Sequence, residues 1–258
     1  MSKQKNNAAG SARDALRQRQ AAQAEADKRA KTTIRIAWIA GLVVIAAMVG
    51  TIAWAFLTAR SNNIAVPGAD GVVAPSNATE AGGVIIGNAD ATVTVTVYAD
   101  FMCPYCGQFE RVNGSALAEA VDSGKAKLEI HPMAFLDDSS GGTKFSTRAA
   151  NAFVTLANED PATALKFHQL VFANQPAEGS TGLTDAQLID FAQQAGASAE
   201  VTATFAKLTF APWVQQITNQ AFSSGITGTP TVKINGTVFK DLYTAGPLAA
   251  AIDKAANA

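Results

Sequence analysis

The amino-acid sequence predicts an α/β domain with an inserted helical subdomain, preceded by a single transmembrane helix. Residues 93–98 alternate with period two and are almost all β-branched, which indicates a strand. A helical pattern over residues 104–121 and a second strand pattern over 127–134 follow, so we expect two parallel strands with the helix as their crossover. Between about residues 143 and 224 only helical patterns are evident, and residues 36–57 contain no charged side chain.

These patterns divide the chain into four parts. They are a cytoplasmic basic head (1–35), the transmembrane helix (36–57), a flexible linker rich in Ala, Gly, Asn and Pro (58–83), and the folded domain (84–258). The insertion covers about residues 138–224, and its expected helices are 146–158, 161–174, 184–195 and 212–223. The domain ends with strands over 231–234 and 237–239, joined by a tight turn at Asn235-Gly236, and a helix over 247–256.

The formal net charge of −1 hides an uneven distribution of charge. Residues 1–35 carry nine Lys and Arg and three Asp and Glu, a net +6, whereas the rest of the chain carries 11 and 18, a net −7. A basic head on an acidic body indicates membrane topology rather than nucleic-acid binding, so we expect no nucleic-acid partner.

The uncharged run over residues 36–57 is long enough to cross a bilayer and contact lipid. At about 1.5 Å per residue its 22 residues extend roughly 33 Å, against a hydrocarbon core of about 30 Å. Trp38 and Trp54 lie near its two ends, where indole rings prefer the membrane interface. The basic residues crowd the N-terminal side, so we expect a single-pass membrane protein with a cytoplasmic N-terminus and an extracytoplasmic domain. A cleaved signal peptide is the alternative, although the head and the apolar run are both longer than is usual for one.

The only two cysteines, Cys103 and Cys106, are separated by two residues. The strand pattern before them and the helical pattern after them place Cys103 at a helix N-terminus, where free N–H groups and the helix dipole favour a thiolate. Pro104 suits the first turn of that helix. Cys106, one turn further on, is expected to be more buried and to react second. The pattern therefore predicts a redox-active disulfide with these two cysteines as the catalytic pair.

Other uses of this spacing fit less well. A c-type haem site requires histidine directly after the second cysteine, where Gly107 stands. A structural zinc site requires two further ligands, and the two histidines, His131 and His168, lie far apart in the sequence. A purely structural disulfide would close a very short loop, which constrains the unfolded chain least. We therefore expect no metal and no cofactor.

Two motifs carry a family resemblance. Residues 98–110, Tyr-Ala-Asp-Phe-Met-Cys-Pro-Tyr-Cys-Gly-Gln-Phe-Glu, and residues 228–232, Gly-Thr-Pro-Thr-Val, resemble the DsbA-like branch of the thioredoxin superfamily in sequence and order. The resemblance covers roughly residues 84–256 and implies a thioredoxin-like fold. It also implies that Pro230 follows a cis peptide bond and packs beside the cysteine pair, and that the backbone of Thr229 binds an extended substrate segment.

The acids near the cysteines depart from the family pattern. Many relatives carry a buried acid six residues before the first cysteine, where this chain has Val97. Asp100 and Glu110 are nearby acids that could assist proton transfer at Cys106, and the alternative is that each is simply solvated. His131 is expected to be a packed core residue rather than a proton shuttle.

The resemblance and the expected location together favour one function. We expect a thiol–disulfide oxidoreductase that acts on extracytoplasmic proteins as a disulfide-forming oxidase, because disulfides persist outside the cytosol. Its partners would be thiol-containing secreted or cell-envelope proteins and a membrane oxidase that reoxidises the cysteine pair. The dipeptide Pro104-Tyr105 replaces the Pro-His of the best-known strongly oxidising relatives, so the oxidising strength stays open. A disulfide reductase or isomerase, and a redox-silent module that binds peptides beside Pro230, are the alternatives.

Overall fold

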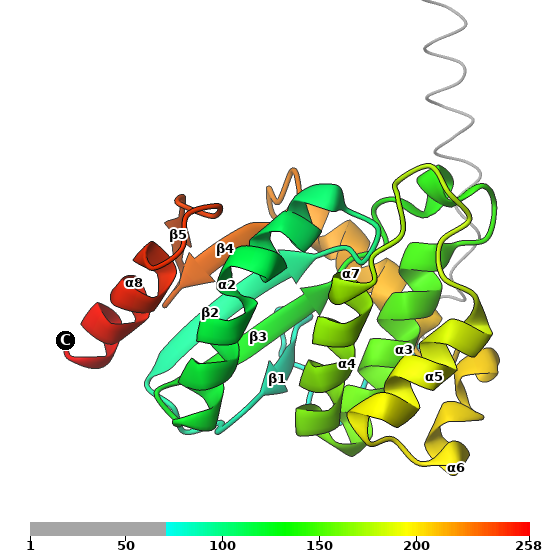
Figure 1. Cartoon of the computed structure of the whole chain (residues 1–258), viewed down its shortest axis with the longest axis horizontal. Helices are drawn as coiled ribbons and strands as arrows, with labels where there is room; N and C mark the ends of the chain where they lie inside the picture. Colours follow the sequence, from blue (N-terminus) through cyan, green and yellow to red (C-terminus); the bar gives the residue numbers. More distant parts are fainter. Residues whose placement is uncertain (1–70) are drawn as a thin grey trace, which may run out of the picture. The chain divides into compact units, whose positions relative to one another are not determined.

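The computed structural model of the protein describes residues 71–258 (Figure 1). The predicted basic head (1–35), the predicted transmembrane helix (36–57) and the first part of the predicted linker (58–70) lie outside the described residues. From residue 71 to the C-terminus, no helix is both long and apolar enough to cross a bilayer.

Five strands form one mixed sheet in the order β1-β3-β2-β4-β5. They are β1 (Val84–Ile86), β2 (Val93–Ala99), β3 (Ala126–Pro132), β4 (Thr231–Ile234) and β5 (Thr237–Phe239). β2 lies in the middle, parallel to β3 and antiparallel to β4, and every residue of β2 except Thr94 is buried. The predicted parallel pair is confirmed. β1 was not predicted, because three residues are too few to show a period.

The β4–β5 hairpin turns at Asn235 and Gly236, whose φ angles are 46° and 82°. Two-residue hairpins require such positive φ values, which is why Asn-Gly is favoured there. Asn235 also bonds to β2. Its N–H donates to the carbonyl oxygen of Thr94 at 2.9 Å, and its side-chain oxygen accepts from the N–H of Thr94 at 2.8 Å. The predicted hairpin is confirmed.

The helices divide between the sheet and the insertion. The crossover helix between β2 and β3 is α2 (Pro104–Asp122), and α8 (Pro247–Ala256) packs against it. The insertion consists of η1 (Asp137–Ser140), α3 (Phe145–Glu159), α4 (Pro161–Ala173), α5 (Asp185–Ala195), α6 (Ala199–Thr202), η2 (Phe205–Lys207) and α7 (Ala211–Ser223). Figure 1 shows α3 to α6 gathered on the β1 side of the sheet, while α2 lies across one face. Each of the four predicted insertion helices is present to within one residue at either end, and only the short elements η1, α6 and η2 were missed.

Aromatic side chains join the insertion to the end of β2. Phe101 is buried, and its ring centroid lies 5.1 Å from that of Phe172 in α4 and 6.0 Å from that of Phe153 in α3. Full burial of a phenylalanine side chain contributes about 1.5–3 kcal/mol to stability. The segment that leads into the cysteine pair is therefore anchored on the helical subdomain.

The last part of the predicted linker packs on the domain. Pro75 is buried, and Asn77 donates its side-chain N–H groups to the carbonyl oxygens of Ala157 at 2.9 Å and Ile85 at 3.3 Å. Gly83 passes so close to the sheet that a Cβ there would lie 2.5 Å from the side chain of Glu129. The folded part of the chain therefore begins at Pro75 at the latest, not at residue 84. The composition of residues 58–83 is typical of a flexible segment. It does not reveal this packing, because the contacts are with residues far away in the sequence and leave no local pattern.

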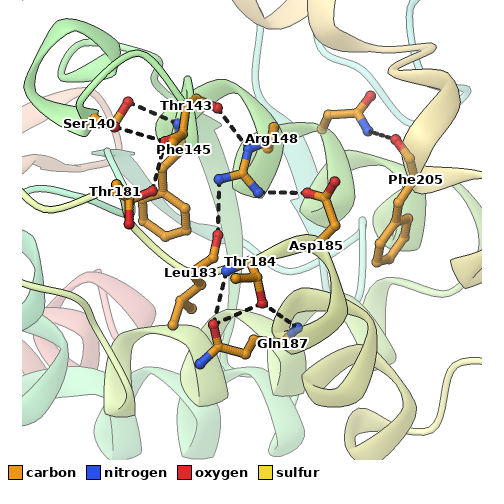
Figure 2. Close-up of polar contacts among 11 residues, drawn as sticks. Ser140, Thr143, Phe145, Arg148, Thr181, Leu183, Thr184, Asp185, Gln187 and Phe205 are labelled. Atoms are coloured by element: carbon orange, nitrogen blue, oxygen red, sulfur yellow. Dashed lines mark hydrogen bonds and ion pairs between the residues drawn. The ribbon is translucent and has the colours of Figure 1, made fainter.

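Arg148 in α3 holds two loops of the insertion together (Figure 2). Its Nε donates to the carbonyl oxygen of Thr143 at 2.8 Å, and its Nη2 donates to that of Leu183 at 2.9 Å. Its Nη1 forms an ion pair with Asp185 at the start of α5, with an N–O distance of 2.6 Å. One side chain thereby satisfies two backbone carbonyls and a carboxylate from three places in the sequence.

Replacing Arg148 by methionine should lower the free energy of unfolding by about 1–3 kcal/mol. Methionine keeps the aliphatic stem but leaves the two loop carbonyls without their donors. Urea unfolding followed by circular dichroism measures the change. Lys166→Met on α4 is the control, because Lys166 is an exposed cation whose loss should change stability by about 0.5 kcal/mol or less. Equal losses in the two variants would show that the Arg148 network does not stabilise the fold.

Candidate redox site

Cys103 lies between the end of β2 and the start of α2. Its backbone is extended (φ −72°, ψ 116°), and it is the N-cap residue of α2, with Pro104 in the first turn as predicted. The N–H of Cys103 donates to the carbonyl oxygen of Asp100 at 3.0 Å, and its own carbonyl accepts from the N–H of Gly107 at 3.1 Å. The predicted position at a helix N-terminus is confirmed.

The two cysteines are free thiols in very different environments. Cys103 is 5% exposed, whereas Cys106 is fully buried one turn inside α2. A hydrogen bond from the Cys106 thiol, helped by Thr229 and by the N–H groups of Cys106 and Tyr105, lowers the pKa of Cys103 to about 6 against the opposing effect of burial. Burial, and then the charge on Cys103, raise the pKa of Cys106 well above its ordinary value. The site therefore separates one reactive sulfur from one that keeps its proton.

The thiol of Cys103 should titrate with a midpoint near pH 6. Only the thiolate is nucleophilic, so the rate of alkylation by iodoacetamide should fall about tenfold per pH unit below that midpoint and level off above about pH 7. Thiolate absorbance at 240 nm should report a single thiolate between pH 7 and 9, because Cys106 stays protonated there. A midpoint near pH 9, or two thiolates appearing together, would contradict this geometry.

A second segment, 126 residues away, meets Cys103. Tyr98 of β2 pairs with Thr231 of β4, which brings the residues just before β4 beside the cysteine loop. The Sγ of Cys103 donates a hydrogen bond to the carbonyl oxygen of Thr229 at 3.4 Å, and Pro230 is buried after a cis peptide bond. The expected cis bond is therefore present beside the cysteine pair.

The outer rim of the site is aromatic. Tyr105, between the cysteines, is 62% exposed, and Pro104 is exposed beside it. The ring of Tyr243, from the loop after β5, lies 6.5 Å from that of Tyr105 between centroids and is itself 41% exposed. Burial, and then the nearby Cys106 and Cys103, raise the pKa of Tyr243. Tyr243 was not predicted, because no motif marks the loop that carries it.

Asp100 is a fully buried anchor and not the solvated acid that was one alternative. One carboxylate oxygen accepts from the N–H of Met102 at 2.8 Å and from the hydroxyl of Ser146 at 2.7 Å. The other accepts from the N–H groups of Phe135 at 2.7 Å and Leu136 at 2.9 Å. Burial raises the pKa of Asp100 to about 6, and the four donors oppose that shift. The side chain thus ties the cysteine loop to the segment after β3 and to α3.

Glu110 is not solvated either. Its Oε1 lies 2.9 Å from Nε2 of His168 in α4, and the two side chains are 9% and 2% exposed. His168 is enclosed by aromatic rings, with centroids 5.4 Å from Phe101 and 4.8 Å from Phe172. The pair therefore links α2 to the inserted subdomain. The sequence pattern alone does not predict this role for His168.

His131 is packed in the core, as expected. It is 1% exposed and stacks on Tyr98 with ring centroids 4.1 Å apart. Val97, where many relatives carry an acid, is buried among the central strands. Within residues 71–258 there is no cluster of three side chains suited to hold a metal ion.

A model of the thioredoxin family, described as "Thioredoxin", matches residues 79–254. The oxidised DsbA of Mycobacterium tuberculosis has the same fold, with 28% identity and a TM-score of 0.56, over 68% of this chain and 98% of that one. Disulfide bond formation protein D of Bacillus subtilis is 27% identical over 173 residues, which are 66% of this chain and 75% of that protein.

A different curated relative matches a shorter region. Serine/threonine-protein kinase PknE of Mycobacterium tuberculosis is 34% identical over 119 residues, or 45% of this chain. The match covers 21% of the kinase, so the chain spans about a fifth of the length of that relative. Nothing in the match assigns kinase chemistry to the present chain.

Proposed function

Because the chain belongs to the thioredoxin family, we propose that it is a thiol–disulfide oxidoreductase that forms disulfide bonds in protein substrates through Cys103 and Cys106. One observation carries the proposal. The sulfur of Cys103, which is 5% exposed, sits at the N-terminus of α2 with a lowered pKa, and the fully buried sulfur of Cys106 has a raised one. Two sulfurs so different in acidity take different roles in exchange.

The oxidase reaction uses that difference at each step. A substrate thiolate attacks Sγ of Cys103 in the oxidised enzyme, the bond to Cys106 breaks, and its electron pair passes to Cys106, which takes up a proton. The second substrate thiolate then attacks the substrate sulfur of the mixed disulfide, and Cys103 leaves as a thiolate. A thiol of low pKa is the better leaving group, and protonated Cys106 is slow to reverse the first step. The substrate loses two electrons and the enzyme gains them as a dithiol.

The dithiol must be reoxidised before another turnover. We place that step with a membrane oxidase, and we place the substrates among thiol-containing secreted or cell-envelope proteins. Support comes from the basic head and the uncharged run over residues 36–57, which favour an anchored domain outside the cytosol. Protease added to intact cells should digest the domain if this location is right, and should leave it intact if the domain is cytoplasmic.

The proposed oxidase differs from a disulfide reductase or isomerase in the direction of thiol–disulfide exchange. A strong oxidase has a reduction potential of about −120 mV, whereas thioredoxin, a reductant, lies at about −270 mV. Equilibration of the purified protein with glutathione buffers gives the potential. A value near that of thioredoxin would exclude the oxidase direction and leave the oxidoreductase class intact.

The Cys106→Ala variant should accumulate mixed disulfides through Cys103 in cells. Alanine suits this fully buried position better than serine, which would bury a hydroxyl without an assured partner. The adducts should be visible on non-reducing gels and vanish on reduction, and the Cys103→Ser/Cys106→Ala protein should form none. An absence of adducts in the single variant would instead support a redox-silent peptide-binding module.

A further inference from the structure

Gln175, two residues after the end of α4, reaches from the inserted subdomain into the cysteine loop. Its Nε2 donates to the carbonyl oxygen of Cys103 at 2.8 Å and to that of Phe101 at 3.1 Å. One amide group thus holds the main chain on both sides of Met102, which is fully buried. No motif in the sequence marks Gln175, and the exchange chemistry described above does not use it.

Gly107 makes room for this contact. A Cβ built on Gly107 would lie 2.0 Å from Oε1 of Gln175 and 2.9 Å from its Cδ, closer than any side-chain atom can approach. Gly107 has helical backbone within α2, so no unusual backbone angle calls for glycine there. Glycine is less favourable than alanine inside a helix, and the approach of Gln175 explains why it stands at this position.

We propose that Gln175 is a positioning residue for the redox site. Its amide fixes the carbonyl of Cys103, and thereby holds Sγ against the N-terminus of α2. The backbone of Cys103 is otherwise held by its N–H bond to Asp100 and by the bond from Gly107 to its carbonyl. Gln175 adds the one restraint on this loop that comes from the segment after α4, so the reactivity of the sulfur depends on the inserted subdomain.

The amide of Gln175 affects the acidity of the Cys103 thiol through the short contacts around Sγ. The thiol of Cys106, the side chain of Thr229 and the N–H groups of Cys106 and Tyr105 favour the thiolate only while the sulfur stays within hydrogen-bond reach. Without the amide of Gln175 the loop can shift, and a shift of a few tenths of an ångström weakens all of these contacts together. Loss of the amide should therefore make the thiol of Cys103 less acidic while leaving the fold intact, since Gln175 is only half-buried.

The first test is Gln175→Met, which keeps the length of the side chain and removes its donors. The midpoint of the Cys103 thiolate titration, read at 240 nm, should rise by about half to one pH unit. Gln175→Asn, whose amide is too short to reach the loop, should give the same shift. Gln193→Met, at an exposed position on α5, is the matched control and should titrate like the wild-type protein. An unshifted midpoint in both Gln175 variants would overturn the proposal.

The second test is a double-mutant cycle with Gly107. Gly107→Ala should displace Gln175 and raise the titration midpoint as Gln175→Met does. In a Gln175→Ala background the nearest remaining atom to the added methyl group is Nη1 of Arg111, at 3.2 Å, the end of an exposed side chain that can move aside. Gly107→Ala should then leave the midpoint unchanged and raise the urea midpoint, as alanine does in a helix. Equal effects of Gly107→Ala in both backgrounds would contradict the proposal.

The role of Gln175 in catalysis rests on the proposed function, whereas its effect on the acidity of the Cys103 thiol does not. Both tests measure thiol acidity and stability without any substrate. They can therefore fail while the oxidoreductase assignment stands, and they can succeed even if a different reaction were found for the cysteine pair.

Discussion

The Cys103→Ser variant should lose catalysed disulfide exchange, with a rate lower on the order of a thousandfold or more. Serine has nearly the shape of cysteine, and its hydroxyl can still donate to the carbonyl oxygen of Thr229 as the thiol does. It cannot form a disulfide, however, and it is not ionised at neutral pH. The change therefore removes the reacting atom and little else. Oxidation of a fluorescent peptide with two cysteines, followed under pseudo-first-order conditions, measures the loss.

The control for this prediction is the stability of the same variant. At pH 5, where the thiol of Cys103 is protonated, its free energy of unfolding should lie within about 1 kcal/mol of that of the reduced wild-type protein, because a single neutral hydrogen bond contributes that much. A folded Cys103→Ser protein that retained more than a tenth of the activity would show that exchange does not pass through this sulfur.

The Asp100→Ala variant should lower the free energy of unfolding by about 3–5 kcal/mol, because a buried donor left without its acceptor costs about 1–3 kcal/mol and removal of the buried charge offsets part of the sum. The wild-type carboxylate is fully buried and accepts from three backbone N–H groups and the hydroxyl of Ser146. Alanine leaves all four donors buried without an acceptor. Urea unfolding of the reduced protein gives the value. Asp90→Ala, at an exposed position before β2, should change stability by about 0.5 kcal/mol or less.

Asp100 also gives a pH dependence with a definite sign. Its folded-state pKa of about 6 lies above the ordinary value of 3.8, so folding favours the protonated form. That contribution to stability is complete below about pH 4 and is lost as the pH rises through about 6. The wild-type protein should therefore lose stability relative to Asp100→Asn between pH 4 and 7, by on the order of 3 kcal/mol. A difference that moved the other way would show that the four donors outweigh burial and hold the pKa below its ordinary value.

Local patterns predicted the parts of the site that lie close together in the sequence. The period of β2, the proline after Cys103 and the helical pattern that follows were enough to place the reactive sulfur at a helix N-terminus. The neighbours of Asp100 and Glu110 come from the segment after β3, from α3 and from α4, so only the fold determines whether either acid is solvated. The same reason explains why Tyr243 and Gln175 were not found.

The contacts that fix the position of the Thr229 carbonyl beside Cys103 lie at the opposite end of β4, where the hairpin turn meets β2. Sliding β4 by one residue along β2 would exchange the faces of Thr231 and Val232 and carry that carbonyl about 3.3 Å along the sheet, beyond the reach of Sγ. The two bonds between Asn235 and Thr94 oppose such a slide, because both break when the strands move. Asn235, an exposed residue in a hairpin turn far from the cysteines, thus fixes the register of β4 on β2. That register keeps the carbonyl oxygen of Thr229 beside Sγ of Cys103.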